Sequence, residues 1–127
     1  MKVERAESSG QFWVLAEDLY QAAVGDLRNR DNLSALEAAE ASVSCALRAV
    51  LADRCGGKLP GELREGSAQV LMCRSQAMLT DDEYEARQSL PNVSAHLRGG
   101  LVAPEAEDVA RYLERVNEVR RWLVRRC

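Results

Sequence analysis

The chain has 127 residues and a mass of 14.1 kDa, which fits one domain, because a single compact core typically takes about 100 to 150 residues. Hydrophobic residues make up 46% and charged residues 29%, which excludes a disordered chain. The 5% aromatic content and three prolines argue against an all-β sandwich or a loop-rich protein. Alanine, leucine, glutamate and arginine dominate, and all four favour helix.

The net charge of −3 gives no global attraction to nucleic acid or to anionic lipid. The charge is unevenly distributed, however. Residues 111–126 carry six arginines and two glutamates, a local balance of +4, so the other residues sum to −7. This basic C-terminal helix could meet phosphates, or the acidic surface of its own fold or of a second subunit. The alternative is a solvated face whose arginines match the helix dipole.

No apolar run approaches the roughly 18 residues of a membrane span, so we expect no membrane association. Residues 1–10 lack the apolar core of a secretory signal, which indicates a cytoplasmic protein with reduced thiols. The cysteines show no CxxC spacing and the chain has one histidine, so we expect neither a metal site nor a cofactor. Cys45 and Cys73 lie in apolar helical contexts and are predicted to be core residues, whereas Cys127 is predicted to be exposed.

Two long helices are predicted in the first half of the chain. Residues 1–9 are expected to be a flexible segment, followed by a helix over residues 10–27 whose inward face comprises Phe12, Leu15, Ala16, Leu19, Ala22, Ala23 and Leu27. The second helix begins near Asn32, where Ser34 and Glu37 have capping-box spacing, and ends at Gly56-Gly57. Its inward face comprises Leu33, Leu36, Ala39, Val43, Ala46, Leu47, Val50 and Leu51.

The second half is predicted to hold a third helix over residues 67–79, a short helix after it, and a last helix. Thr80 and Glu83 mark a capping box before the short helix, and Pro91 interrupts that helix or begins a new one. The last helix starts at Pro104, and its inward face comprises Val109, Tyr112, Leu113, Val116, Val119 and Leu123. Together these stripes predict a single all-α domain over residues 1–127, an antiparallel four- to five-helix bundle. The alanine-rich second helix permits close packing, either against a helix of the same chain or against a second copy, and for so small a bundle we expect a homodimer.

The one cluster that suggests chemistry surrounds the single histidine, because phosphate loops, nucleophile elbows and dinucleotide fingerprints are absent. His96 is the side chain best suited to proton transfer near pH 7, and Asn92 lies four residues before it. RNA cleavage also needs a cation on the phosphate, for which Arg87 and Arg98 are candidates.

The chain resembles the HEPN domains (higher eukaryotes and prokaryotes nucleotide-binding). The residues that carry this resemblance are the alanine-rich helix over residues 33–51, which ends in leucines and glycine, and Asn92-Val93-Ser94-Ala95-His96, which is similar to the family's Arg-Asn-x-x-x-His motif. The resemblance implies a homodimeric helical bundle that binds RNA or a nucleotide. It also implies a minimal nucleotidyltransferase as a protein partner, in a toxin-antitoxin or defence system. Pro91 stands where the motif has arginine, so a catalytically degenerate member is expected.

Three functions therefore stay open. The first is a HEPN-like module for nucleotide or RNA binding, with Arg120 and Arg121 of the last helix as further phosphate-binding candidates. The second is a structural or adaptor bundle for protein–protein interaction, in which His96 has no role. The third is a metal-independent RNase with His96 as general acid or base and Asn92 as a positioning group.

Overall fold

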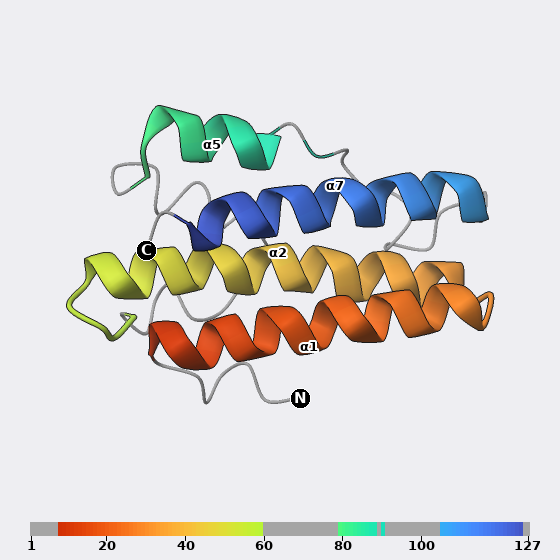
Figure 1. Ribbon diagram of the computed structural model, residues 1–127, viewed down its shortest axis with the longest axis horizontal. Coiled ribbons are helices and arrows are strands. Elements are labelled where there is room, and N and C mark those ends of the chain that lie inside the picture. The colour runs from red at the N-terminus through yellow and green to blue at the C-terminus, as the bar shows by residue number, and fades with distance from the viewer. Residues whose placement is uncertain (1–7, 60–78, 89, 91–104, 126–127) are drawn as a thin grey trace.

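The computed structural model describes residues 8–59, 79–88, 90 and 105–125. Within these ranges the chain forms four helices and no β-strand, which confirms the prediction of an all-α bundle. The helices are α1 (Ser9–Arg28), α2 (Asn32–Arg54), α5 (Asp81–Gln88) and α7 (Ala106–Val124) (Figure 1). The predicted helix over residues 67–79 and the segment around Pro91 lie outside the described residues.

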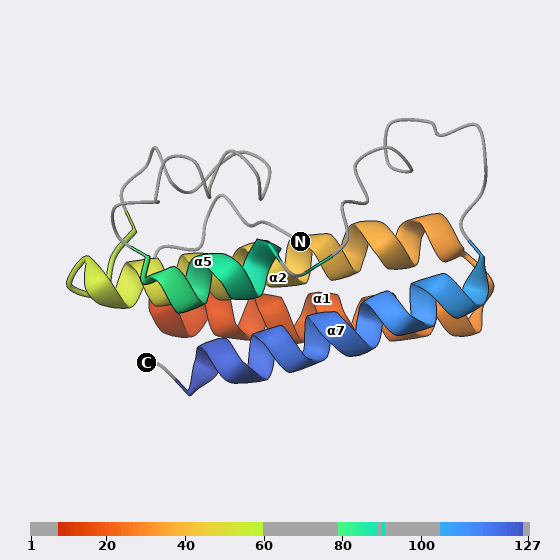
Figure 2. The same ribbon diagram turned by 90° about the horizontal axis from the view of Figure 1, so that it is seen from above.

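The three long helices pack side by side along most of their length (Figures 1 and 2). α1 and α2 form an antiparallel hairpin, and α7 contacts both of them. α7 runs in the same direction as α2 and therefore antiparallel to α1 (Figure 1). The short α5 lies over α2 and α7 at the end of the bundle where α2 ends (Figure 2). No helix in the described ranges combines the length and the apolarity that crossing a membrane requires.

α2 is the central helix of the bundle. Every residue from Ser42 to Ala52 is buried, so this part of α2 contacts neighbours on all sides. Small side chains permit that close approach: the Ser42 hydroxyl donates a 2.6 Å hydrogen bond to the carbonyl oxygen of Ala16 on α1. Near the start of α2, however, Leu33 is 42% exposed, whereas Ala35 and Leu36 after it are buried, so the predicted place of Leu33 on the inward face is wrong.

Local hydrogen bonds set the ends of α1 and α2. Ser8 and Gln11 form a reciprocal capping box at the start of α1. The cap of α2 is Asp31, whose side chain accepts from the Ser34 amide at 3.3 Å, so the predicted Ser34–Glu37 box is wrong. After α2, Gly56 and Gly57 have positive φ angles of 81° and 103°, as the prediction of a glycine stop requires.

The last helix follows its sequence pattern closely. All six residues of the predicted inward face of α7 are buried. The helix begins at Ala106, two residues later than predicted, with Glu105 as its N-cap. On α1 the pattern is less accurate, since Ala22 is exposed and only three of the seven predicted inward residues are fully buried: Phe12, Ala16 and Ala23.

An ion pair joins α5 to α2. The predicted capping box is confirmed, because the Thr80 hydroxyl accepts from the Glu83 amide at 3.3 Å and a Glu83 carboxylate oxygen accepts from the Thr80 amide at 2.9 Å. The same carboxylate is fully buried and receives both terminal nitrogens of the Arg54 guanidinium. A residue predicted only as a cap therefore also attaches α5 to the C-terminal end of α2.

Candidate functional site

Two of the six candidate site residues can be placed with their side chains. Arg87 lies on α5, but its side chain is outside the described part of the structure. Asn92, His96 and Arg98 also lie outside the described residues. Within the described residues, the candidate site comprises Arg120 and Arg121 of α7 and the surface around them.

Arg120 connects α7 to α1. Its guanidinium forms an ion pair with Glu17, donates a 2.8 Å hydrogen bond to the Asn117 side chain, and lies 4.9 Å from the centroid of the Tyr20 ring. Gln21 also donates to the Glu17 carboxylate, at 3.1 Å. These five residues form what we call the α1–α7 clamp. With 15% of its side chain exposed, Arg120 links two helices of its own chain and presents little of its charge to solvent.

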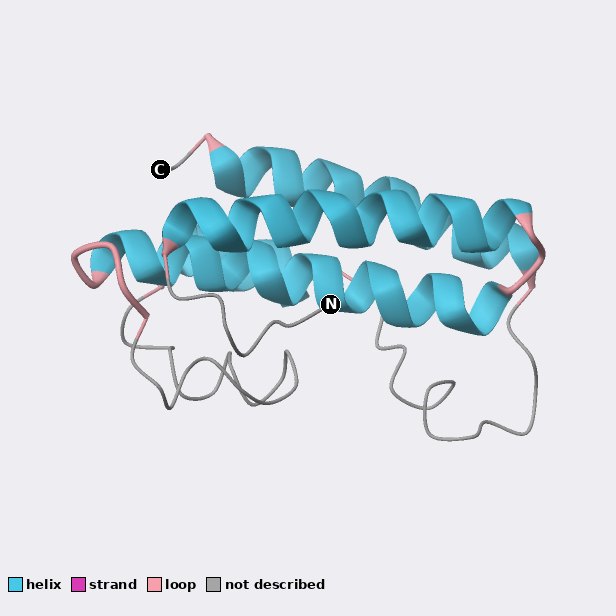
Figure 3. Ribbon diagram, turned by 90° about the horizontal axis from the view of Figure 1, so that it is seen from below, coloured by secondary structure: helices cyan, strands magenta, loops and turns pink. Residues whose placement is uncertain are grey.

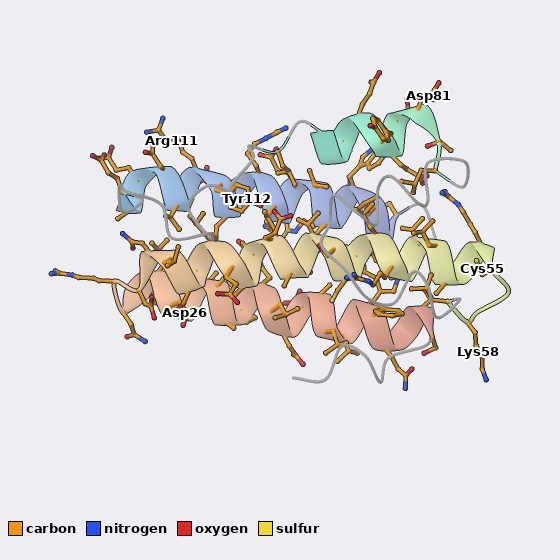
Figure 4. The ribbon with its side chains drawn as sticks, turned by 180° about the vertical axis from the view of Figure 1, so that it is seen from behind. Asp26, Cys55, Lys58, Asp81, Arg111 and Tyr112 are labelled. Carbon is orange, nitrogen blue, oxygen red and sulfur yellow. The ribbon has the colours of Figure 1, made fainter. Side chains whose placement is uncertain are left out.

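The arginines in the first half of α7 are also matched by carboxylates of the same helix. Arg111 lies 3.3 Å from Asp108, and Arg115 lies 2.6 Å from Glu118. Such exposed pairs add only about 0 to 1 kcal/mol of stability, but they reduce the positive potential that a phosphate would meet. Figure 4 shows Arg111 pointing away from the bundle while the neighbouring Tyr112 points toward α2.

Arg121 of α7 and Arg125, which caps the end of this helix, differ from the other arginines of α7. Both are exposed, they lie one turn apart near the C-terminal end of the helix, and neither has an ion-pair partner within the described ranges. The structure thus separates the two predicted phosphate-binding residues of α7. Arg120 belongs to the clamp, whereas Arg121 is accessible.

Two exposed valines lie next to the clamp, one on each of its two helices. Val14 is 61% exposed and Val124 is 46% exposed. Val14 lies one turn before Glu17 on α1, and Val124 lies one turn after Arg120 on α7. Because the two helices are antiparallel (Figure 1), both steps lead toward the same end of the bundle. We call this surface, on the side of the clamp that faces solvent, the α1–α7 face.

A second polar cluster lies inside the bundle on α2. The Tyr112 hydroxyl of α7 donates a 2.6 Å hydrogen bond to Glu40, and one turn further along α2 the Ser44 hydroxyl donates to the Glu40 carbonyl oxygen at 3.1 Å. Arg48 follows after another turn and is 4% exposed. Burial lowers the pKa of the Arg48 guanidinium, and burial raises the pKa of the neighbouring Cys45 thiol to about 11.

This internal cluster offers little chemistry to a ligand. A thiol with so high a pKa is protonated near neutral pH and is a poor nucleophile or metal ligand. The predicted core position of Cys45 is confirmed, with 1% of the residue exposed. Within the described ranges, no group of three or more side chains has an arrangement that could hold a metal ion. The cluster therefore functions as a buried polar contact between α2 and its neighbours.

The comparisons with known proteins do not identify this chain. No protein-family model matches it, and no curated protein and no solved structure matches it. The resemblance to HEPN domains thus stays a sequence-based prediction.

The clamp residues on α1 could not have been identified from sequence. Glu17 and Arg120 are 103 positions apart, and no local pattern connects two residues so distant. Val14 was identifiable in principle, because it falls between the inward positions Phe12 and Ala16 and so projects outward from a helix. The periodicity of α1 or of α7 alone does not show that the two valines lie at the same end of the bundle.

Proposed function

We propose that the protein is a cytoplasmic interaction module that works as a homodimer and binds protein surfaces. The observation that carries this proposal is the charge pairing on α7. Three of its four arginines, Arg111, Arg115 and Arg120, are bound to carboxylates of the same chain. The surface beside them combines exposed valines with charges of both signs, a composition that suits a protein partner better than a polyanion.

The HEPN-like function is the second candidate, as a module for RNA or nucleotide that works with a nucleotidyltransferase-type partner. The exposure of Arg121 and Arg125, with no ion-pair partner in the described structure, favours it. Two adjacent cations on a helix can contact successive phosphates. The catalytic form of this candidate, a metal-independent RNase, depends on His96 and Asn92, and would show as RNA cleavage that is lost in His96→Ala.

The two candidates differ in how RNA binding depends on salt. We expect a labelled single-stranded RNA to show no specific anisotropy change with the wild-type protein or with the double variant Arg121→Glu, Arg125→Glu. Phosphate contacts would instead give an affinity that falls steeply between about 50 mM and about 200 mM salt. The logarithmic slope would then drop by about 1.4 in the double variant, since each lost contact to a single strand removes about 0.7. That result would replace the interaction module with the RNA-binding candidate.

A further inference from the structure

We propose that a second copy of this chain docks on the α1–α7 face, with α1 of each copy packed antiparallel on α7 of the other. The twofold axis then runs parallel to these helices. This inference rests on the homodimer of the proposed function and names its interface. Three properties of the face indicate that its partner is a second copy of the chain: its register, its charge pattern and its size.

The register of the face comes from the clamp. The ion pair between Glu17 and Arg120 places these two residues at the same level of the antiparallel helices. One turn toward one end, Val14 is level with Val124. Asp18 directly follows Glu17, and Arg121 directly follows Arg120. These two residues therefore also lie near the same level. Toward the other end, Arg28 reaches the level of the first turn of α7, which contains Glu107.

A twofold axis parallel to the helices converts this register into contacts between two molecules. Rotation about such an axis keeps every residue at its own level and exchanges the positions of α1 and α7. Val14 of each copy therefore meets Val124 of the other, and the contact occurs twice. These are two of the three large hydrophobic side chains that are exposed in the described structure.

The charges of the face are complementary under the same rotation. Asp18 of one copy comes opposite Arg121 of the second copy, and Arg28 comes opposite Glu107 of the second copy. All four side chains are exposed in the single chain. Along α1 the charge changes from acidic to basic, and at the same levels α7 changes from basic to acidic. A face with this pattern attracts a copy of itself.

The same pattern disfavours a polyanion on this surface. The exposed carboxylates of Asp18, Glu107 and Glu114 lie among the arginines, and each would repel a phosphate backbone.

The size of the α1–α7 face also suits a dimer. Helices of 19 and 20 residues are about 30 Å long, and two of them side by side cover on the order of 600 Å² in projection. A stable interface needs about 800 Å² of accessible surface per partner, and accessible surface exceeds its projection.

The test is sedimentation velocity with light scattering over the micromolar range, with folding of each variant checked by circular dichroism. We expect the wild type to show twice the chain mass of 14.1 kDa. Val14→Glu is expected to weaken dimerisation at least about tenfold. Leu33→Glu is the matched control, because Leu33 is an exposed hydrophobic residue at the opposite end of the bundle. It should leave the dimer unchanged.

A charge exchange tests the register directly. Asp18→Arg and Arg121→Glu should each weaken the dimer about tenfold, and the double variant should recover most of the loss, because the pair is restored with its signs reversed. A dimer that neither Val14→Glu nor the charge variants affect would overturn this interface while leaving the homodimer intact. A chain that stays monomeric throughout would overturn both.

Discussion

At the residue scale, the most informative side chains are those buried against expectation. Arg48 and Glu83 are charged residues with 4% and 0% exposure, although charged side chains rarely leave water unless they are paired. Glu83 is paired with Arg54, and Arg48 has Cys45 beside it. The predicted burial of Cys45 is confirmed. Its environment also raises the pKa of its thiol, which the composition and spacing of the sequence could not indicate.

The raised pKa of Cys45 predicts a loss of stability at alkaline pH. In the unfolded chain this thiol ionises near its ordinary value of 9.0, and in the folded protein at about 11. Between these values the folded state binds more protons, so the free energy of unfolding falls as pH rises through this window. Cys45→Ala should reduce that fall, as measured by urea unfolding below and above the window.

Cys55→Ala is the matched control for the alkaline experiment, since Cys55 lies at the end of α2 and is only partly buried (Figure 4). We expect it to leave the pH dependence of unfolding almost unchanged. An equal flattening in both variants would show that the burial of Cys45 does not cause the effect.

At the element scale, the helices differ in what determines their positions. α7 has a clear apolar stripe and packs as that stripe predicts. The middle of α2 is buried on every side, so its periodicity carries no information about which face meets which neighbour. α5 has mostly polar residues, and its capping box was predictable because it spans only residues 80–83. Its attachment to α2 was not, since it joins residues 29 positions apart.

Removal of the Glu83 charge should therefore destabilise the fold. Glu83→Gln leaves Arg54 without its carboxylate partner, and we expect a loss of about 2 to 3 kcal/mol in the free energy of unfolding. The loss is smaller than the ~3–5 kcal/mol of a fully buried pair, because 29% of the Arg54 side chain reaches solvent. Urea unfolding measures the change, with a shifted midpoint and an unchanged m-value.

Glu85→Gln provides the comparison on the same helix. Glu85 is exposed, and a substitution there should change stability by less than about 0.5 kcal/mol. If the two variants unfold at the same midpoint, the buried ion pair contributes no net stability and α5 is held by its other contacts.

At the scale of the whole molecule, α1, α2 and α7 share one hydrophobic core, and Figure 3 shows these three long helices packed side by side. Trp13 on α1 and Trp122 on α7 are both partly buried against it. We therefore expect one cooperative unfolding transition, as is usual for single domains of this size. The single-tryptophan variants Trp13→Phe and Trp122→Phe should report equal fluorescence midpoints after correction for the stability change of each substitution. Separate midpoints would show that α7 unfolds independently of α1.

The sequence by itself determined the helical class, the approximate bounds of the long helices and the inward face of α7. It could do so because periodicity, capping residues and glycine stops act within a few residues along the chain. The HEPN resemblance remains a prediction, and Asn92 and His96, which carry part of it, lie outside the described residues.

Only the tertiary structure decided which side chains meet across the helices. It brought Glu17 to Arg120, Glu40 to Tyr112 and Arg54 to Glu83. Each of these contacts depends on the direction, rotation and offset of two packed helices. Those quantities are set by how all the apolar faces fit together at once, and no local pattern of residues specifies them.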